Sequence, residues 1–179
     1  MSKSVLISIR PEWCEMIANG EKTIEVRKSK PKLETPFKCY IYETRGRTDI
    51  PWQDEDGHLD FHGRGQIIGE FVCDRITNLF AESRFWIDEK IVEKTCLTGN
   101  QIREYANGKE SIYGWHISDL KIYDKPRDAG EFLFKCSGDC DACKHSVLDP
   151  FESFDEPRYN CKCAYHIPQS WCYTKGYLK

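Results

Sequence analysis

The sequence predicts an α+β fold in which a mixed β-barrel carries a few short helices and a cysteine-rich insertion near the C-terminus. Three observations support this prediction. Several segments alternate apolar and polar residues with a period of two, which is typical of strands. Only three stretches carry helix signals, and six of the ten cysteines follow residue 135. Many strands with few helices indicate a closed or nearly closed barrel.

The N-terminal part predicts a strand, a short helix and a second strand. Apolar residues alternate over Val5–Ile9, so Arg10 leaves the strand on its polar side. Pro11 suits the first turn of a helix of about two turns, and the pair at 19–20 (Asn-Gly) suits a left-handed helix end. Alternation returns over Thr23–Arg27, which places the polar side chains of that segment on one side.

The middle of the chain predicts two further strands joined by a long irregular segment. Phe37–Thr44 is rich in β-forming residues, and Gln66–Ile76 has the same character with Gly69 inside it. A glycine there indicates a bulge or a close approach of backbones. Residues 45–65 show no periodicity, so we expect a flap or a disordered connection that covers the cleft.

Two short helices and two strands are expected in the remainder. Ile87–Lys94 predicts one helix, and a capping box at Thr98–Gln101 opens a second helix that ends at residues 107–108, with Ile102 and Tyr105 facing inward. Tyr113–Tyr123 predicts a long strand that ends before Pro126. Pro168–Tyr173 is expected to close the barrel, so we divide the chain into a barrel (1–130), an insertion (131–167) and a closing strand (168–179).

Composition limits the class of protein. The net charge is −3 and the pI is about 6.0, so the chain lacks the overall basic character of strong nucleic-acid binders, and any polyanion site is local. The N-terminal residues contain neither a signal-peptide core nor an apolar run long enough to cross a membrane. We therefore expect a cytoplasmic protein.

The motif that carries most information is Gly20-Glu21-Lys22-Thr23-Ile24-Glu25-Val26-Arg27. With the segments around it, it resembles the G-x-K-T-x-x-x-R signature of the ASCH superfamily. The resemblance covers most of residues 4–126 and implies a PUA-like barrel with a cleft beside the signature. It also implies roles that range from RNA binding to hydrolysis of acylated cytidine nucleosides. The fold alone does not choose between these roles.

The first functional hypothesis is binding of RNA, a nucleotide or a modified nucleoside in this cleft. Basic side chains would hold phosphate, aromatic side chains would stack on a base, and the signature would add a hydroxyl and a carboxylate. The candidate ligand-binding residues are Arg10, Lys22, Thr23, Glu25, Arg27, Lys28 and Trp115, with Trp13 and Tyr42 as further stacking candidates. The alternative interpretation of the motif is a solvated turn with a structural Arg27–carboxylate pair.

The second hypothesis is an amidohydrolase that acts on N4-acetylcytidine-like substrates. The resemblance implies that Lys22 is catalytic, because it matches the lysine of the signature. Where that branch of the family carries a second threonine, this chain has Glu25, which could act as a general acid or base. His116 is a weaker catalytic candidate, since most lone histidines are structural.

The cysteine-rich insertion predicts a structural zinc site. Three thiols follow a C-x3-C-x2-C pattern and two more follow a C-x-C pattern, and four soft ligands from two short segments are typical of closed zinc sites. The predicted ligands are Cys136, Cys140, Cys143, Cys161 and Cys163, with His145 or His166 as substitutes. Free thiols and an iron–sulfur cluster are the alternatives, and the insertion is also the basis of a third hypothesis, a protein-interaction module. The other five cysteines are expected to be buried.

Overall fold

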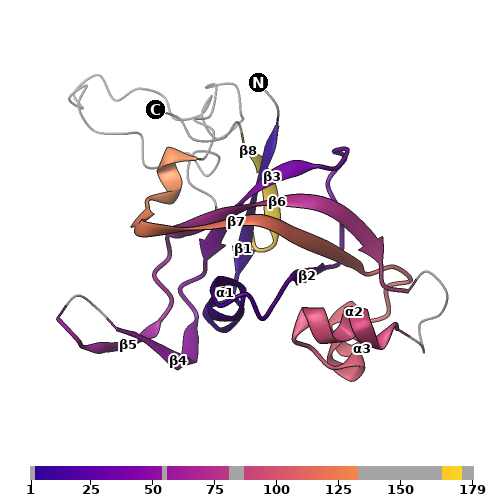
Figure 1. Ribbon diagram of the computed structural model, residues 1–179, viewed down its shortest axis with the longest axis horizontal. Helices are drawn as coiled ribbons and strands as arrows, with labels where there is room; N and C mark the ends of the chain where they lie inside the picture. Colours follow the sequence, from indigo (N-terminus) through magenta and orange to yellow (C-terminus); the bar gives the residue numbers. More distant parts are fainter. Residues whose placement is uncertain (1–2, 54–55, 81–86, 133–166, 175–179) are drawn as a thin grey trace, which may run out of the picture.

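The computed structural model describes residues 3–53, 56–80, 87–132 and 167–174. A six-stranded mixed sheet in the order β2-β7-β6-β3-β1-β8 curls into a half-barrel (Figure 1). The α1 helix and the α2–α3 pair lie along one side of this sheet, and β2 lies between them. The α+β, PUA-like fold class predicted from the sequence is confirmed.

The strands follow the periodicity of the sequence closely. β1 (Ser4–Ile9) pairs in parallel with β3 (Phe37–Glu43) and antiparallel with β8 (Trp171–Thr174). β6 (Ile67–Asn78) lies between β3 and β7 (Tyr113–Arg127), and β7 also pairs with β2 (Ile24–Arg27). Apart from the β1–β3 pair, every pairing in this sheet is antiparallel.

The outer strands of the sheet are joined by side chains. The indole Nε1 of Trp171 in β8 donates to Ser29 Oγ at 3.1 Å, just after β2. The main-chain N–H of Lys32 donates to the hydroxyl of Tyr173 at 2.7 Å. These bonds hold the two edges of the half-barrel together without a strand ladder between them.

Gly69 has the role that the sequence predicted. A side chain at this position would meet the Lys121 carbonyl oxygen at 2.5 Å. The pairing of β6 shifts register next to Gly69 in both of its ladders. The shift lies between Ile41 and Tyr42 in the ladder with β3, and between Ile67 and Gly69 in the ladder with β7. The bulge and close backbone approach therefore bend β6 as the sheet curls.

Three short α-helices lie within the described residues: α1 (Pro11–Ala18), α2 (Glu89–Thr95) and α3 (Gly99–Ala106). The predicted capping box of α3 is present, with Gln101 N–H bonded to the Thr98 hydroxyl at 3.2 Å and Thr98 N–H bonded to the Gln101 side chain at 2.8 Å. None of the helices in the described ranges has the length and hydrophobicity needed to cross a bilayer.

The prediction for residues 45–65 is wrong. β4 (Arg47–Gln53) and β5 (Leu59–His62) form a two-stranded antiparallel hairpin that extends beside α1 (Figure 1). Leu59–His62 does alternate apolar and polar residues, so a strand signal was present in the sequence and was missed. Pro51 argued against a strand at β4, but a strand with a free edge tolerates proline. The same freedom lets β7 continue past Pro126 to Arg127.

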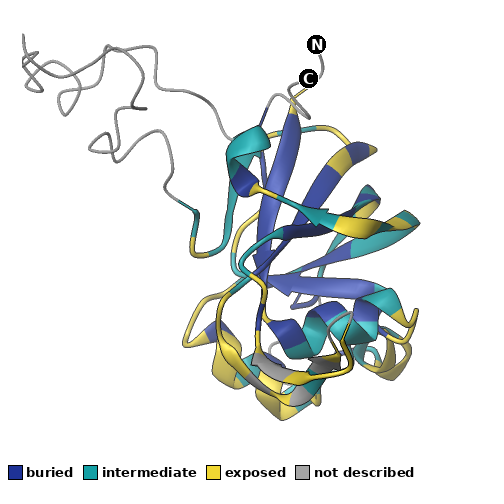
Figure 2. Cartoon of the chain, turned by 90° about the vertical axis from the view of Figure 1, so that its left-hand side faces the viewer, coloured by how far each residue is buried: buried dark blue, intermediate teal, exposed yellow. Residues whose placement is uncertain are grey.

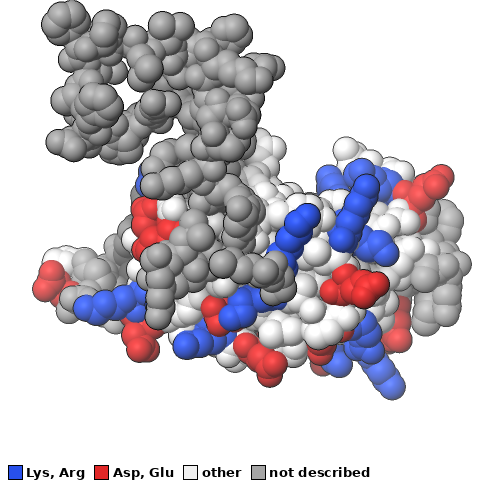
Figure 3. Space-filling model, turned by 90° about the horizontal axis from the view of Figure 1, so that it is seen from above, with Lys and Arg blue, Asp and Glu red and all other residues white. Residues whose placement is uncertain are grey.

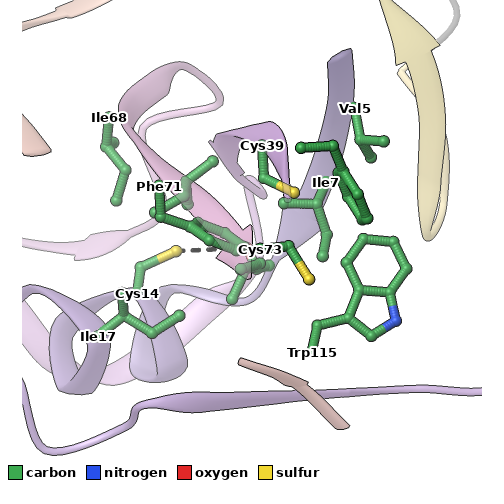
Figure 4. Packing of buried hydrophobic residues seen from close by; sticks show 12 residues of the cluster. Val5, Ile7, Cys14, Ile17, Cys39, Ile68, Phe71, Cys73 and Trp115 are labelled. Carbon is green, nitrogen blue, oxygen red and sulfur yellow. Dashed lines mark hydrogen bonds between the residues drawn. The ribbon is translucent and has the colours of Figure 1, made fainter. Parts of the chain in front are cut away.

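The core lies between the curled sheet and α1. Figure 2 shows buried residues concentrated along the strands, and Figure 4 shows the packed side chains, including the buried thiols of Cys14, Cys39 and Cys73. Burial raises the pKa of all three thiols. Cys96 and Cys172, which were also expected to be buried, are half-buried.

Candidate functional site

The turn that follows α1 positions the signature. Gly20 has a φ of +78°, a conformation that favours glycine over residues with a side chain. The main-chain N–H groups of Glu21 and Lys22 both donate to the Met16 carbonyl, at 2.9 and 3.0 Å. The chain therefore folds back over the end of α1 and delivers Lys22 to the start of β2.

Lys22, Glu25 and Arg27 form a buried charge cluster. Lys22 Nζ lies 3.4 Å from Glu25 Oε2, and Arg27 Nη2 lies 3.0 Å from Glu25 Oε1. The three residues are only 2%, 6% and 6% exposed. Because two cations share one carboxylate, the cluster carries an excess positive charge in a site where burial makes charges costly.

The alternative interpretation, a solvated turn, is wrong for this reason. In a solvated turn the charged side chains would lie at the surface in contact with water. The side chains of Lys22, Glu25 and Arg27 are instead buried and paired with one another, as buried charges usually are. Only the structural Arg27–carboxylate contact of that interpretation is present, and it lies inside the protein.

Two further contacts fix the ammonium group of Lys22. Its Nζ donates to the Thr95 carbonyl at 2.6 Å, at the end of α2, and lies 5.3 Å from the centre of the Trp13 ring. A neighbouring main-chain bond, from Thr23 N–H to the Lys94 carbonyl at 3.0 Å, joins the same two segments. The α2–α3 pair is thereby tied to the signature.

Arg27 connects β2 with β1 through its side chain. Its Nη2 donates to the Ser8 carbonyl at 2.5 Å as well as to Glu25. Its Nε has no hydrogen-bond partner within the described part of the chain. A guanidinium offers five N–H donors, so Arg27 has donor capacity beyond these two contacts.

A cavity of about 420 Å³ opens beside this cluster. Its lining comes from β1 and α1, from β2, from the α2–α3 pair and from the segment before β8. The lining residues are Ser8, Ile9, Arg10, Trp13, Lys22, Glu25, Val26, Arg27, Thr44, Leu97, Gln101, Tyr105 and Gln169.

Four of the predicted ligand-binding residues line the cavity together, namely Arg10, Lys22, Glu25 and Arg27. Thr23 is not in the lining, and its main chain joins α2 and β7. Lys28 is not in the lining either, but its Nζ lies 4.8 Å from the centre of the ring of Tyr105, which does line the cavity.

The structure does not support Trp115 as a stacking platform. Its side chain is fully buried in the core of the half-barrel, against Phe37 and Trp171, and is not part of the cavity lining (Figure 4). The physical reason is the register of β7, in which Trp115 faces the barrel interior. Tyr42 is likewise buried, in a second core cluster.

Tyr105 takes the role of exposed aromatic instead. It was expected to face inward with Ile102, but Ile102 alone is fully buried and Tyr105 is 38% exposed. The buried face of α3 runs through Ile102 and Ala106, four residues apart, and this leaves Tyr105 at the edge of that face. Tyr105 and Trp13, the stacking candidate that does line the cavity, present two aromatic rings from different helices.

Four residues of the cavity lining were not predicted from the sequence to belong to the site. Thr44, Leu97, Gln101 and Gln169 come from segments far apart in the chain, and only the folded topology brings them together. Gln101 was recognised for its capping role, and the same side chain accepts from Thr98 Oγ1 at 3.1 Å.

Charged side chains of both signs are mixed on the surface. Figure 3 shows Lys and Arg side chains among Asp and Glu side chains over the face seen from above. At the cavity, the Arg10 side chain is 76% exposed and lies 3.9 Å from Glu12. The mixed surface agrees with the net charge of −3.

The predicted zinc ligands and His116 are not among the described residues of this site. The predicted zinc ligands, Cys136 to Cys163, lie outside the described residues. Among the residues that are described, no group of three or more metal-ligating side chains is present. His116 lies outside the cavity, where its ring nitrogens are 3.1 Å from Arg75 Nη2 and 2.9 Å from Thr77 Oγ1.

Residues 7–126 match the family model of the ASCH domain. The fold is similar to the crystal structure of ASCH from Zymomonas mobilis, with a TM-score of 0.52 and 21% identity over 70% of this chain and 73% of that chain. Structures of two mutant forms of that protein are similar as well. One gives a TM-score of 0.51 and 21% identity over 70% and 73% of the two chains. The other gives 0.50 and 20% over 72% and 77%. No curated protein matches the sequence.

Proposed function

Because the chain belongs to the ASCH domain family, a PUA-like family often linked to RNA binding, we propose that it binds RNA or a nucleotide in the cavity beside Lys22. The observation that carries this proposal is the buried Lys22–Glu25–Arg27 cluster at a cavity with two aromatic rings in its lining. One nucleotide unit would occupy the cavity, and the rest of an RNA chain would cross its rim.

The dimensions and lining of the cavity suit a nucleotide. Its volume of about 420 Å³ falls within the range of small-molecule sites. Trp13 and Tyr105 offer stacking surfaces, and proteins that bind single-stranded RNA commonly stack exposed bases on aromatic side chains. Glu25 can accept hydrogen bonds only, so it would select the donor groups of a base.

The charges favour an anionic partner. Arg27 and Lys22 outnumber Glu25 inside the cavity, and Arg10 and Lys28 add two cations at its edge. We assign the phosphate contacts to Arg10 and Lys28, since their side chains are the ones not held by the buried carboxylate. Such contacts supply affinity that falls as salt rises.

A binding experiment tests the proposal. Fluorescence anisotropy of a labelled single-stranded RNA is measured between about 50 and 200 mM salt, a range over which counterion release changes affinity strongly. For each phosphate contact removed, by Arg10→Ala or Lys28→Ala, the salt slope is expected to fall by about 0.7. Lys121→Ala, on β7 and outside the cavity lining, is the matched control and leaves the slope unchanged.

The proposal fails if RNA and nucleotides show no affinity for the protein. It also fails if Arg10→Ala, Lys28→Ala and Lys121→Ala weaken binding equally, because a diffuse surface interaction would then explain the data.

One observation favours a second function, hydrolysis of N4-acylated cytidine. Lys22 Nζ and Glu25 Oε2 lie 3.4 Å apart at the cavity. One substrate molecule could therefore contact both an amine and a carboxyl group, which together can supply a general base and a general acid. In this reaction the oxygen of water bonds to the acyl carbon, the bond from that carbon to N4 breaks, and N4 receives a proton. The products are cytidine and a carboxylic acid.

Mass-spectrometric turnover of N4-acetylcytidine separates the two functions. Turnover by the parent protein and its loss in Lys22→Met and Glu25→Gln would establish the hydrolase. Absence of turnover in a parent protein that binds RNA would leave the binding function alone. Lys121→Ala again serves as the control for general damage.

A further inference from the structure

The main chain of β2 forms part of the cavity wall. Three consecutive residues of this strand, Glu25, Val26 and Arg27, all line the cavity. Side chains of consecutive residues in a strand point to opposite faces, and those of Glu25 and Arg27 share the face that carries the charge cluster. A cavity that touches all three residues therefore reaches the main chain of the strand at Val26.

One edge of β2 is open in the sheet. Within the part of the chain that the structure describes, β2 is the first strand in the order of the larger sheet and pairs only with β7. The ladder includes a bond of 2.9 Å from Ile117 N–H to the Thr23 carbonyl. Since main-chain groups of alternate residues face the same neighbour in an antiparallel pair, those of Glu25 and Arg27 face β7 and those of Val26 face away from it.

Val26 therefore turns one main-chain donor and one main-chain acceptor toward the cavity. Within the described ranges of the chain, neither group has a hydrogen-bond partner. Val26 is only 5% exposed, and its side chain packs in the cluster beneath α2 and α3. Buried main-chain groups are nearly always paired, so an unpaired pair at a cavity wall indicates a place for a ligand.

We propose that the main-chain N–H and C=O of Val26 pair with the Watson–Crick edge of a nucleobase, which deepens the proposed function and rests on it. The bases carry hydrogen-bond donors and acceptors side by side on this edge, matching the donor and acceptor of one strand residue. Glu25 adds an acceptor on one side of Val26, and Arg27 adds donors on the other. A base held in this way requires a Watson–Crick edge free of substituents.

Amide hydrogen exchange measured by NMR tests the assignment. In the free protein, the Val26 amide is expected to exchange at least about tenfold faster than the amides of Glu25 and Arg27, which are bonded within the ladder. Saturation with cytidine 5′-monophosphate is expected to slow exchange of the Val26 amide by about tenfold or more and to leave the exchange rates of the Glu25 and Arg27 amides unchanged. Ribose 5-phosphate, which has no base, is expected to leave Val26 unchanged.

A second ligand tests the same contact through affinity. The N4,N4-dimethyl derivative of cytidine 5′-monophosphate carries methyl groups in place of both N4 hydrogens on its Watson–Crick edge, keeps a neutral base, and is expected to bind at least about tenfold more weakly, the loss of one good hydrogen-bonded contact. Both ligands carry the same phosphate, so the comparison isolates the base.

The outcomes separate this inference from the proposed function. If cytidine 5′-monophosphate binds while the Val26 amide keeps its exchange rate, or if the methylated ligand binds equally well, the Val26 contact is wrong and nucleotide binding stands. A Val26 amide already as protected as its neighbours in the free protein also overturns the contact. If neither nucleotides nor RNA bind, the proposed function fails and this inference fails with it.

Discussion

Removal of the Glu25 charge is expected to destabilise the fold strongly. In Glu25→Gln, the cations of Lys22 and Arg27 stay buried, 3.4 and 3.0 Å from a neutral amide in place of a carboxylate. Breaking a buried ion pair by removing one partner costs about 3–5 kcal/mol, because the remaining charge is uncompensated. For a chain of this length each kcal/mol lowers Tm by about 2–4 °C, so we expect a loss of about 6–20 °C.

The assay is chemical and thermal denaturation of the parent and four variants, which include the two single variants Glu25→Gln and Lys22→Met. Lys38→Met breaks the exposed Lys38–Glu70 pair, which has a similar distance of 2.9 Å but a lysine side chain that is 43% exposed. It is expected to cost at most about 1 kcal/mol. The double variant Lys22→Met/Glu25→Gln removes one uncompensated cation and is expected to be more stable than Glu25→Gln alone.

Two results would refute this reasoning. The first is unfolding of Glu25→Gln at the same denaturant concentration as Lys38→Met, which would show that the charge cluster is solvated. The second is additivity in the double variant, which would show that Lys22 and Glu25 do not interact in the folded protein.

Three further predictions concern other parts of the molecule. A side chain at Gly63 would overlap the Thr44 carbonyl oxygen, so Gly63→Ala is expected to lower the free energy of unfolding by about 1–3 kcal/mol, measured by chemical denaturation. Gly46 has room for a methyl group, so Gly46→Ala is the control and is expected to change this free energy by at most about 0.5 kcal/mol. Equal effects of the two substitutions would contradict the packing of the hairpin. Burial, together with the nearby Arg75 cation, lowers the pKa of His116, so the unfolded chain binds its proton more readily. Stability is therefore expected to fall as the pH drops through about 6.5, and less so in His116→Gln; identical pH profiles would exclude this source. The cysteine-rich insertion is expected to hold about one zinc ion per chain, and elemental analysis of unchelated protein that finds less than about half an equivalent would reject that site.

The sequence predicted the elements whose local pattern and packing agree. Alternation located β1, a run of β-forming residues located β3, and the capping box located the start of α3. The hairpin of β4 and β5 was missed because Pro51 and the glycines and aspartates around it are typical of a loop, although Leu59–His62 alternates apolar and polar residues. Among the described strands, these two pair only with each other, so no neighbour in the main sheet marked their place.

The site was predictable as far as it lies in one segment. Lys22, Glu25 and Arg27 are close in sequence, and the glycine turn and strand alternation were enough to bring them together. Their burial was not predictable, because it depends on α2 and α3 covering the start of β2.

The burial of Trp115 and the exposure of Tyr105 could not be predicted from the sequence. Both are aromatic residues in regular elements, and the sequence alone gave no register against the rest of the sheet. The fold buries Trp115 and leaves Tyr105 at the cavity. Tertiary packing decided which aromatic ring is available to a ligand.

The central claim, that a nucleotide unit occupies the cavity beside Lys22, is tested most directly by photocrosslinking. A single-stranded RNA that carries 4-thiouridine is irradiated with the protein, and the linked peptides are identified by mass spectrometry. We predict crosslinks at Trp13 or Tyr105, with loss of these crosslinks when excess unlabelled nucleotide competes. Crosslinks confined to residues outside the cavity lining, unaffected by the competitor, would contradict the account.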